Sequence, residues 1–350
     1  YQACYKCGGF GPGIIRRLQV MKKIFILLIA ILLLFTGCKS EDRFEKVDME
    51  YYDYFDTVIT ITYYGDSRRK DEVKEAVEEK LKYYHNLLTD YEGEGVVATI
   101  NREGRGDNKE LVALTKQVLQ DEKNVDYVVD LSKGKLFRLW KDAILNENLP
   151  SQDQIDAAMK TGGPDSVEIV DEEIILKNSA QLDYGAFCKG YLNDELVKLM
   201  RDLKIDNYIL NSGGNITVMG KPAANRDKFT IGIQSPFDTN DYVDTITTSN
   251  MSVVTSGDYQ RYAVIDGEYY HHIIDLKTGY PAHNHKRSIT ILGPSAYVCD
   301  FLSTSLFLKS EDEVEEILKA YPDYYYYTVY DDQTFTCSEE LKSILGSFNK

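Results

Sequence analysis

Residues 182 to 191 read Leu-Asp-Tyr-Gly-Ala-Phe-Cys-Lys-Gly-Tyr. The carboxylate of Asp183 leads into small residues, and these lead into a helix that we expect over residues 189 to 203. The first turn of a helix has free backbone N–H groups, which suit phosphate, and Lys189 adds a positive charge there. A capping aspartate followed by a glycine turn explains the same residues without any ligand. The segment therefore predicts a loop and a helix start, and leaves a binding site open.

Helical and strand patterns interleave on both sides of this segment. A strand is expected over 57 to 63 from its alternation, and an amphipathic helix over 73 to 88 from its spacing of three and four. Further expected elements are a helix capped by Ser151 and Gln154, a hairpin over 167 to 176, helices over 296 to 308 and 311 to 321, and strands at 208 to 210 and 324 to 327. Because no regular βα repeat appears, we predict an α+β fold of mixed or antiparallel sheets with flanking helices, in one bilobed domain.

The N-terminal region carries a targeting pattern. Lys22 and Lys23 precede an apolar run from Ile24 to Phe35, and Thr36, Gly37 and Cys38 follow. A basic start, a short apolar core and a small residue before cysteine are typical of a lipoprotein signal peptide. We expect residues 1 to 20 to be an upstream extension outside the fold, 21 to 37 the signal peptide, 38 to 50 a tether lipidated at Cys38, and 51 to 350 the folded domain. An uncleaved membrane anchor is the alternative.

The charge of the chain limits its partners. Of 40 basic and 56 acidic residues, five basic ones and no acidic one lie before Cys38, so the rest has a formal charge of about −21. Nucleic acid is not expected, because phosphate backbones require a basic surface. A phosphate-containing ligand would need a metal cation. Cys188, Cys299 and Cys337 form no disulfide framework, and buried free thiols are the simplest interpretation.

Two further polar segments follow expected strands. Asn211 to Asn215 reads Asn-Ser-Gly-Gly-Asn, where Gly213 and Gly214 permit close approach of a ligand and Asn215 offers an amide, although a plain hairpin turn explains the segment as well. His271 and His272 follow the stretch from Val254 to Arg261. On a strand they point to opposite faces, so one of them can face a pocket and act as a general base with a nearby carboxylate, unless both are surface residues.

The last polar segment lies on the helix expected from Ala296. Asp300 and Thr304 are four residues apart, so their oxygens share one face of that helix. Oxygen-only ligands favour magnesium or calcium over zinc. A polar stripe without a ligand is the alternative interpretation.

Taken in order, these segments resemble the ApbE-type FAD:protein FMN transferases, a family of exported flavin-transfer enzymes that are often lipoproteins. The matching stretches are LDYGAFCKGY at 182, NSGGNI at 211, IGIQSP at 231, SVVTSGDYQRY at 252, YHHIIDLKTGYPA at 270 and the helix with Asp300 and Thr304. The resemblance covers nearly all of residues 50 to 345. It implies FAD as substrate, Mg²⁺ as cofactor, and transfer of FMN through a phosphoester bond to a threonine or serine of an acceptor flavoprotein, with release of AMP.

The resemblance also implies roles for individual residues. Asp300 and Thr304 would hold the metal through their side chains, and Ala186 and Tyr297 through backbone carbonyls. His272 would be the base, and Asp275 would orient or assist it. The residues expected to contact FAD are Asp183, Lys189, Tyr91, Val128, Val129, Asp130, Gly213, Gly214, Asn215, Thr255, Gly257 and His272.

Three other functions fit the sequence less completely. An FAD pyrophosphatase would use the same site with water as the acceptor and would yield FMN and AMP. A flavin-binding lipoprotein without turnover would have no use for Asp300 and Thr304, and a purely structural surface lipoprotein would leave all four segments unexplained. For the transferase, we expect attachment to the cell membrane by a lipid on the extracytoplasmic face, and an acceptor that is a flavoprotein of extracytosolic electron transfer.

Overall fold

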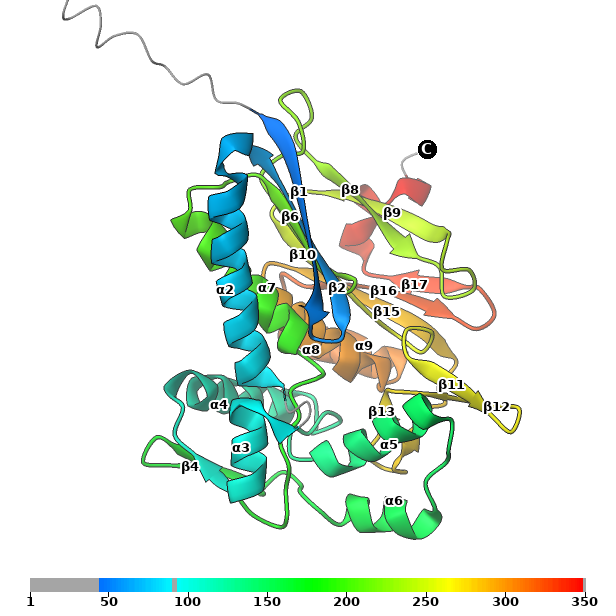
Figure 1. Cartoon of the computed structure of the whole chain (residues 1–350). Helices are drawn as coiled ribbons and strands as arrows, with labels where there is room; N and C mark the ends of the chain where they lie inside the picture. Colours follow the sequence, from blue (N-terminus) through cyan, green and yellow to red (C-terminus); the bar gives the residue numbers. More distant parts are fainter. Residues whose placement is uncertain (1–43, 90–92, 349–350) are drawn as a thin grey trace, which may run out of the picture. The chain divides into compact units, whose positions relative to one another are not determined.

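The computed structural model describes residues 44 to 89 and 93 to 348. The expected upstream extension, the expected signal peptide, the expected lipidation site Cys38 and the expected flavin contact Tyr91 lie outside these ranges. Residues from Phe44 onward form one compact unit (Figure 1). Within the described part of the chain, no helix has the length and apolar character needed to cross a membrane.

An eight-stranded sheet with the order β1-β2-β6-β7-β10-β15-β16-β17 runs through this unit (Figure 1). Its strands are β1 (Glu45–Tyr54), β2 (Thr57–Gly65), β6 (Tyr208–Ser212), β7 (Asn215–Met219), β10 (Met251–Gly257), β15 (Lys286–Gly293), β16 (Tyr325–Tyr330) and β17 (Phe335–Cys337). Every neighbouring pair is antiparallel. Together with the helices around it, this sheet confirms the predicted α+β class.

Helices and small sheets surround the main sheet. The helices are α2 (Lys70–Leu88), α3 (Gly95–Glu103), α4 (Lys109–Asn124), α5 (Gly134–Asn146), α6 (Gln152–Met159), α7 (Cys188–Asp202), α8 (Ala296–Phe307) and α9 (Glu311–Leu318), with 3₁₀ turns η1 (Ser67–Arg69), η3 (Glu339–Ser343) and η4 (Gly346–Phe348). The small sheets pair β3 (Arg105–Gly106) and β4 (Val167–Val170) with β5 (Glu173–Leu176), β8 (Phe229–Gln234) with β9 (Tyr242–Thr248), β11 (Tyr262–Ile265) with β12 (Glu268–His271), and β13 (Ile274–Asp275) with β14 (Tyr280–Pro281).

Both faces of the main sheet are buried, each in its own core. Successive residues of a strand point to opposite faces, so Val254 packs in the core under α2, α7 and α8, while Val253 packs in the core under β8 and β9. A third cluster forms around Trp140 of α5 and Ile155 of α6. On the face covered by the helical core, α8 packs over β10 and β15. The polar residues of α8 that form the candidate site lie on this face.

The expected elements are present with small shifts at their ends. The capping box of α6 has both of its hydrogen bonds, from the Gln154 amide to the Ser151 hydroxyl and from the Ser151 amide to the Gln154 side chain. Helix α2 buries the predicted apolar stripe. Two histidines were expected on a strand: His271 ends β12, and His272 lies just after it.

One expectation was wrong: residues 45 to 50 are not a tether. They form the first part of β1, which pairs with β2 in a register that places Val47 opposite Tyr63. Val47, Met49 and Tyr51 alternate with exposed residues and are buried, so a strand pattern was present among the charges. The folded domain therefore begins before residue 51.

Candidate functional site

The site forms where α7 and α8 meet. Gly190 lies so close to α8 that a Cβ atom there would be 2.3 Å from the Ala296 carbonyl oxygen and 2.6 Å from the Asp300 Cβ atom. At this short separation the Gly190 amide donates a hydrogen bond of 2.8 Å to the Asp300 carboxylate. Asp300 is 3% exposed. Glycine at position 190 thus lets the start of α7 hold the buried carboxylate of α8 in place.

Oxygen donors from three elements gather around this contact. The Thr304 hydroxyl donates to the Ala186 carbonyl at 3.3 Å, and it lies 3.2 Å from the Ser256 hydroxyl of β10. Asp300 is one turn before Thr304 on the same face of α8. A carboxylate, a hydroxyl and a backbone carbonyl suit a hard divalent cation such as magnesium. The structure thus brings Thr304 and Ala186 into contact one turn from Asp300, and their role as metal ligands stays a prediction.

Two features distinguish the surroundings of Asp300. Burial raises the pKa of Asp300, and Lys189, the Gly190 amide and the Asn215 side chain act in the opposite direction. The Nδ2 atom of Asn215 is buried and makes no hydrogen bond to any described residue, although the Asn215 side chain is close enough to influence Asp300. A buried donor without a partner suits an oxygen of a bound ligand.

Tyr297, expected to give a backbone carbonyl to the metal, lies in the first turn of α8. Its hydroxyl donates to Asp121 at 2.7 Å and its amide donates to Asp194 at 3.1 Å. The carbonyl role of Tyr297 stays a prediction.

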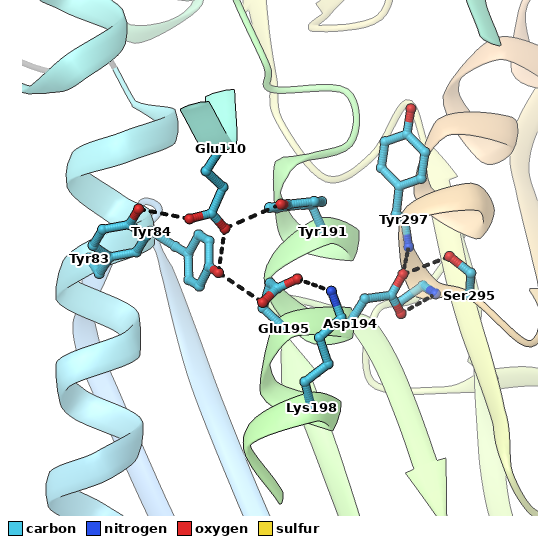
Figure 2. A network of polar contacts seen from close by, with 10 residues as sticks. Tyr83, Tyr84, Glu110, Tyr191, Asp194, Glu195, Lys198, Ser295 and Tyr297 are labelled. Carbon is cyan, nitrogen blue, oxygen red and sulfur yellow. Dashed lines mark hydrogen bonds and ion pairs between the residues drawn. The ribbon is translucent and has the colours of Figure 1, made fainter. Parts of the chain in front are cut away.

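A polar network ties the first turn of α8 to the middle of α7 and, through α7, to α2 (Figure 2). Asp194 of α7 accepts hydrogen bonds from the Ser295 hydroxyl at 2.6 Å and from the Ala296 and Tyr297 amides. Next to it, Glu195 accepts a hydrogen bond from the Tyr84 hydroxyl of α2 at 2.8 Å. Asp194 therefore caps α8 from a neighbouring helix and fixes the alignment on which the contact between Gly190 and Asp300 depends.

The structure distinguishes the two histidines. His271 is 3% exposed, its Nε2 atom lies 2.8 Å from the Ala282 carbonyl, and its Nδ1 atom accepts the Ile273 amide. Both ring nitrogens are occupied in a neutral imidazole, so His271 is structural. In His272 the Nδ1 atom lies 3.2 Å from the Arg261 carbonyl, and Nε2 has no partner among the described residues. Donation from Nδ1 leaves the lone pair on Nε2 available to accept a proton.

The environment of His272 keeps its ring neutral. Burial lowers the pKa of His272 to about 3, with smaller contributions from Arg261, His271 and Lys189. A ring with this pKa is in its basic form at neutral pH, but it is a weak base until a bound anion counteracts the nearby cations.

The hydrogen bonds of Asp275 to described residues lie within its own turn, and its expected role beside His272 stays a prediction. The Asp275 carboxylate accepts the Lys277 amide at 2.8 Å, and the Asp275 carbonyl accepts the Thr278 and Gly279 amides. These bonds close the tight turn between β13 and β14. The group that orients the His272 ring is the Arg261 carbonyl, which lies at the start of β11 and was missed because a backbone acceptor leaves no sequence signal.

Cationic side chains converge near the start of α7, although the chain as a whole is acidic. Lys189 opposes the rise in the pKa of Asp300 that burial causes, and it also contributes to the low pKa of His272. Asp183 accepts the Gly185 amide at 2.7 Å, and its pKa, raised by burial, is reduced by Lys141, Arg138 and Arg261. The expected FAD contacts Asp183 and Lys189 thus lie in one electrostatic neighbourhood with the candidate base and the candidate metal ligands.

Burial and hydrogen bonds within the chain hold the segment from Val128 to Asp130 in place. Val129 and Asp130 are buried, and the Asp130 carboxylate accepts the Ser132 amide and hydroxyl. Behind them, the buried Glu122 accepts the Leu131 amide, and burial raises the pKa of Glu122 well above its usual range. These bonds account for Asp130 structurally, and its contact with flavin stays a prediction.

The remaining predicted residues lie on β10 and on the β6–β7 turn. Gly213 and Gly214 both have left-handed backbone angles in this turn. Asn193 of α7, which the sequence did not single out, donates to the Asn215 carbonyl at 2.9 Å and accepts the Ser212 hydroxyl. Thr255 of β10 pairs with Thr290 across the sheet, and Gly257 ends β10. The turn therefore brings Asn215 to Asp300, whereas Thr255 has a partner within the sheet.

The fold is α+β, and it brings a buried carboxylate, a hydroxyl and a backbone carbonyl together where α7 meets α8. Comparison with known proteins agrees: the model of the ApbE family matches residues 55 to 327, and the chain belongs to that family. A protein from Klebsiella pneumoniae described as an FAD:protein FMN transferase is 31% identical over 236 residues, which are 65% of this chain and 72% of the relative.

Solved structures share the fold, and two of them illustrate the similarity. The ApbE protein of Thermotoga maritima superposes with a TM-score of 0.77 at 27% identity, over 86% of this chain and 99% of that chain. The flavinyl transferase ApbE of Pseudomonas stutzeri, without ligand, gives a TM-score of 0.73 at 21% identity, over 85% and 96%.

Proposed function

We propose that this protein is an FAD:protein FMN transferase that depends on magnesium. Family membership makes it a transferase enzyme that uses FAD. One arrangement carries the proposal: the Gly190 amide, next to Lys189, holds the buried Asp300 carboxylate at 2.8 Å where the Thr304 hydroxyl meets the Ala186 carbonyl. The Arg261 carbonyl engages Nδ1 of His272, so that Nε2 is available as a base. This juxtaposition provides for the two needs of the reaction, charge neutralisation at phosphate and removal of a proton.

The residues around Asp300 fit a magnesium ion. Asp300, Thr304 and the Ala186 carbonyl would hold it, and a bound Mg²⁺ would neutralise charge on the pyrophosphate oxygens. Lys189 lies next to this cluster and adds positive charge at the start of α7, where backbone N–H groups also suit phosphate. The protein thereby lowers the repulsion that two phosphates present to an incoming oxygen.

His272 completes the step. A threonine or serine hydroxyl of the acceptor attacks the phosphorus of the FMN half, its proton passes to Nε2 of His272, and the bond between that phosphorus and the bridging oxygen breaks. The electron pair leaves with AMP. Because Nδ1 of His272 is directed at the Arg261 carbonyl, the ring presents Nε2 in one orientation.

A pyrophosphatase is the second candidate, since the same groups would activate water. The feature that favours transfer is the half-buried setting of His272, because a base screened from solvent meets fewer water molecules.

The place of action follows from the sequence. The pattern from Lys22 to Cys38 supports a lipid anchor on Cys38, which holds the enzyme at the extracytoplasmic face of the cell membrane. Flavoproteins of extracytosolic electron transfer are then the accessible acceptors.

The proposal is tested by incubating residues 39 to 350 with FAD and magnesium, with and without a domain that carries a flavinylation threonine, and by quantifying AMP and protein-bound flavin. The expected result is AMP together with covalently bound flavin, both abolished by EDTA. AMP with free FMN would indicate the pyrophosphatase instead. Bound FAD without AMP under every condition would contradict both enzymatic proposals.

A further inference from the structure

A buried asparagine of α7 joins this helix to two strands of the main sheet. Asn193 is fully buried. Its Nδ2 atom donates to the Asn215 carbonyl at 2.9 Å, and its Oδ1 atom accepts the Ser212 hydroxyl at 2.7 Å. Ser212 ends β6 and Asn215 begins β7, so one side chain binds both strands at the turn that contains Gly213 and Gly214. Asn193 therefore fixes the β6–β7 turn against α7.

The same face of α7 also holds the helix that carries the candidate metal ligands. Gly190 precedes Asn193 by three residues, so both lie on one face of α7. The Gly190 amide donates to the Asp300 carboxylate at 2.8 Å, one turn before Asn193 reaches the β6–β7 turn. Helix α7 thus sets the positions of Asp300 and Asn215 together, and a shift of the turn along α7 would change their separation.

The polar groups that surround Asn193 lie on the sheet face that α7 and α8 cover. The register pairs Ser212 with Asn215 and Thr217 with Ser252, and directly opposite residues of neighbouring strands share a face. The Thr217 hydroxyl accepts Nδ2 of Asn193 at 3.4 Å and lies 3.0 Å from the Ser252 hydroxyl. Burial of these polar groups is tolerated because each of them has a partner.

One donor at this place has no such partner. Asn215 is 2% exposed, and its Nδ2 atom makes no hydrogen bond to any described residue. The Asn215 side chain opposes the rise in the pKa of Asp300 that burial causes, and Lys189 acts on the same carboxylate. An unpaired buried amide is unfavourable, so a partner that arrives with the ligand accounts for it. A donor beside a lysine and a cluster of cation-binding oxygens suits an anionic oxygen.

We propose that Asn193 is a positioning residue of the candidate site, which holds the β6–β7 turn so that Nδ2 of Asn215 donates to a phosphoryl oxygen of FAD. This proposal rests on the proposed transferase function, because FAD supplies the phosphoryl oxygen. It explains why a polar side chain occupies a fully buried position of α7, where an apolar one would avoid the cost of desolvation.

The test compares Asn193→Ala, Asn215→Ala and the double variant in residues 39 to 350, with Ser252→Ala as the matched control. Ser252 is as buried as Asn193, and its hydroxyl pairs with Thr217 at the far end of the same network. We measure the Kd of FAD by flavin fluorescence with magnesium and without acceptor. The Kd of ADP, which has a pyrophosphate but no flavin, follows from its displacement of FAD. Chemical denaturation reports the stability of each variant, and Asn193→Ser replaces Asn193→Ala if the alanine variant does not fold.

The expected result is a Kd of FAD raised about tenfold or more in Asn215→Ala and about three- to tenfold in Asn193→Ala. The double variant should stay within about twofold of Asn215→Ala, because Asn193 acts through Asn215. The Kd of ADP should rise by similar factors. Ser252→Ala should bind FAD like the wild type, whatever its loss of stability.

Three results would overturn the proposal. They are a folded Asn193 variant with the FAD affinity of the wild type, losses that multiply in the double variant, and a raised Kd of FAD with an unchanged Kd of ADP. A wild type that binds no FAD would overturn the proposed function and this proposal together. A wild type that binds FAD but transfers no FMN would contradict the transferase alone, since the role of Asn193 is measured by binding.

Discussion

His271 and His272 are adjacent in sequence and differ in role because of their tertiary partners. The alternation of a strand predicts that they point apart, but it does not tell which one is available for chemistry. The choice depends on the Ala282 carbonyl and the Ile273 amide, which occupy His271, and on the Arg261 carbonyl, which occupies one nitrogen of His272. These are backbone groups, and their positions follow from the fold.

Substitution of His272 by Asn tests its role as the base. We expect the rate of FMN transfer at saturating substrates to fall by about 10²- to 10⁴-fold, because the acceptor proton loses its destination. FAD binding should stay within about twofold, since other residues hold the pyrophosphate. The matched control is His285→Asn at an exposed histidine, which should transfer FMN at the wild-type rate. Loss of FAD binding in His272→Asn would indicate a binding role instead.

The pH dependence offers an independent check on His272. Its pKa is lowered to about 3, so the neutral base persists as pH falls through the usual histidine range. Protonation abolishes a base, and therefore the acid limb attributable to His272 in kcat/KM for FAD should lie far below pH 6.5. The measurement is the profile of kcat/KM from about pH 5 to pH 8, and circular dichroism checks that the enzyme stays folded over this range. A limb centred near 6.5 that disappears in His272→Asn would contradict this assignment.

At the scale of elements, local patterns predicted most helices, while their mutual alignment came from long-range contacts. The capping box of α6 and the stripe of α2 are local and were visible in the sequence. The cap that Asp194 provides to α8 joins residues about a hundred positions apart, so no local pattern reveals it. Strand β1 was missed because charged residues alternate with its buried ones on an edge strand.

Removal of the Asp194 carboxylate should loosen α8. In Asp194→Ala three hydrogen bonds to Ser295, Ala296 and Tyr297 are lost, and we expect the free energy of unfolding to fall by about 2 kcal/mol. Chemical denaturation measures this loss. Asp202→Ala, in the exposed last turn of α7, is the matched control and should change stability by less than about 0.5 kcal/mol. Equal stabilities of the two variants would exclude the proposed cap.

The close approach of α7 to α8 predicts a strong effect of one methyl group. In Gly190→Ala the added Cβ would overlap the Ala296 carbonyl, so the helices must separate and the amide of residue 190 moves away from Asp300. We expect a loss of about 1–3 kcal/mol in stability and a weaker response of FMN transfer to magnesium. In Gly65→Ala the new atom would meet only ordinary contacts with Tyr63, so this control should retain both properties. A wild-type magnesium response in Gly190→Ala would contradict the role of this contact.

At the scale of the whole molecule, the order of motifs indicated the family and the fold class, and the main sheet brings the motifs together. Pairing of β10 with β15 places Ser256 opposite Ile289 and sets α8 over both strands. The loop at 183 to 190 reaches the same place through α7. Composition predicted an acidic molecule that needs a metal to bind phosphate, but it could not show that Arg138, Lys141, Lys189 and Arg261 lie near the site. Convergence of charge is a property of tertiary structure.

The central claim is that the oxygen cluster around Asp300 holds the magnesium that FMN transfer requires. The most direct test titrates magnesium and measures covalent flavin on the acceptor for the wild type, Asp300→Asn and the control Asp202→Asn. We predict that Asp300→Asn needs at least about tenfold more magnesium or loses transfer altogether, because it removes the charged ligand while keeping the shape. An Asp300→Asn enzyme with the magnesium dependence and rate of the wild type would contradict the claim.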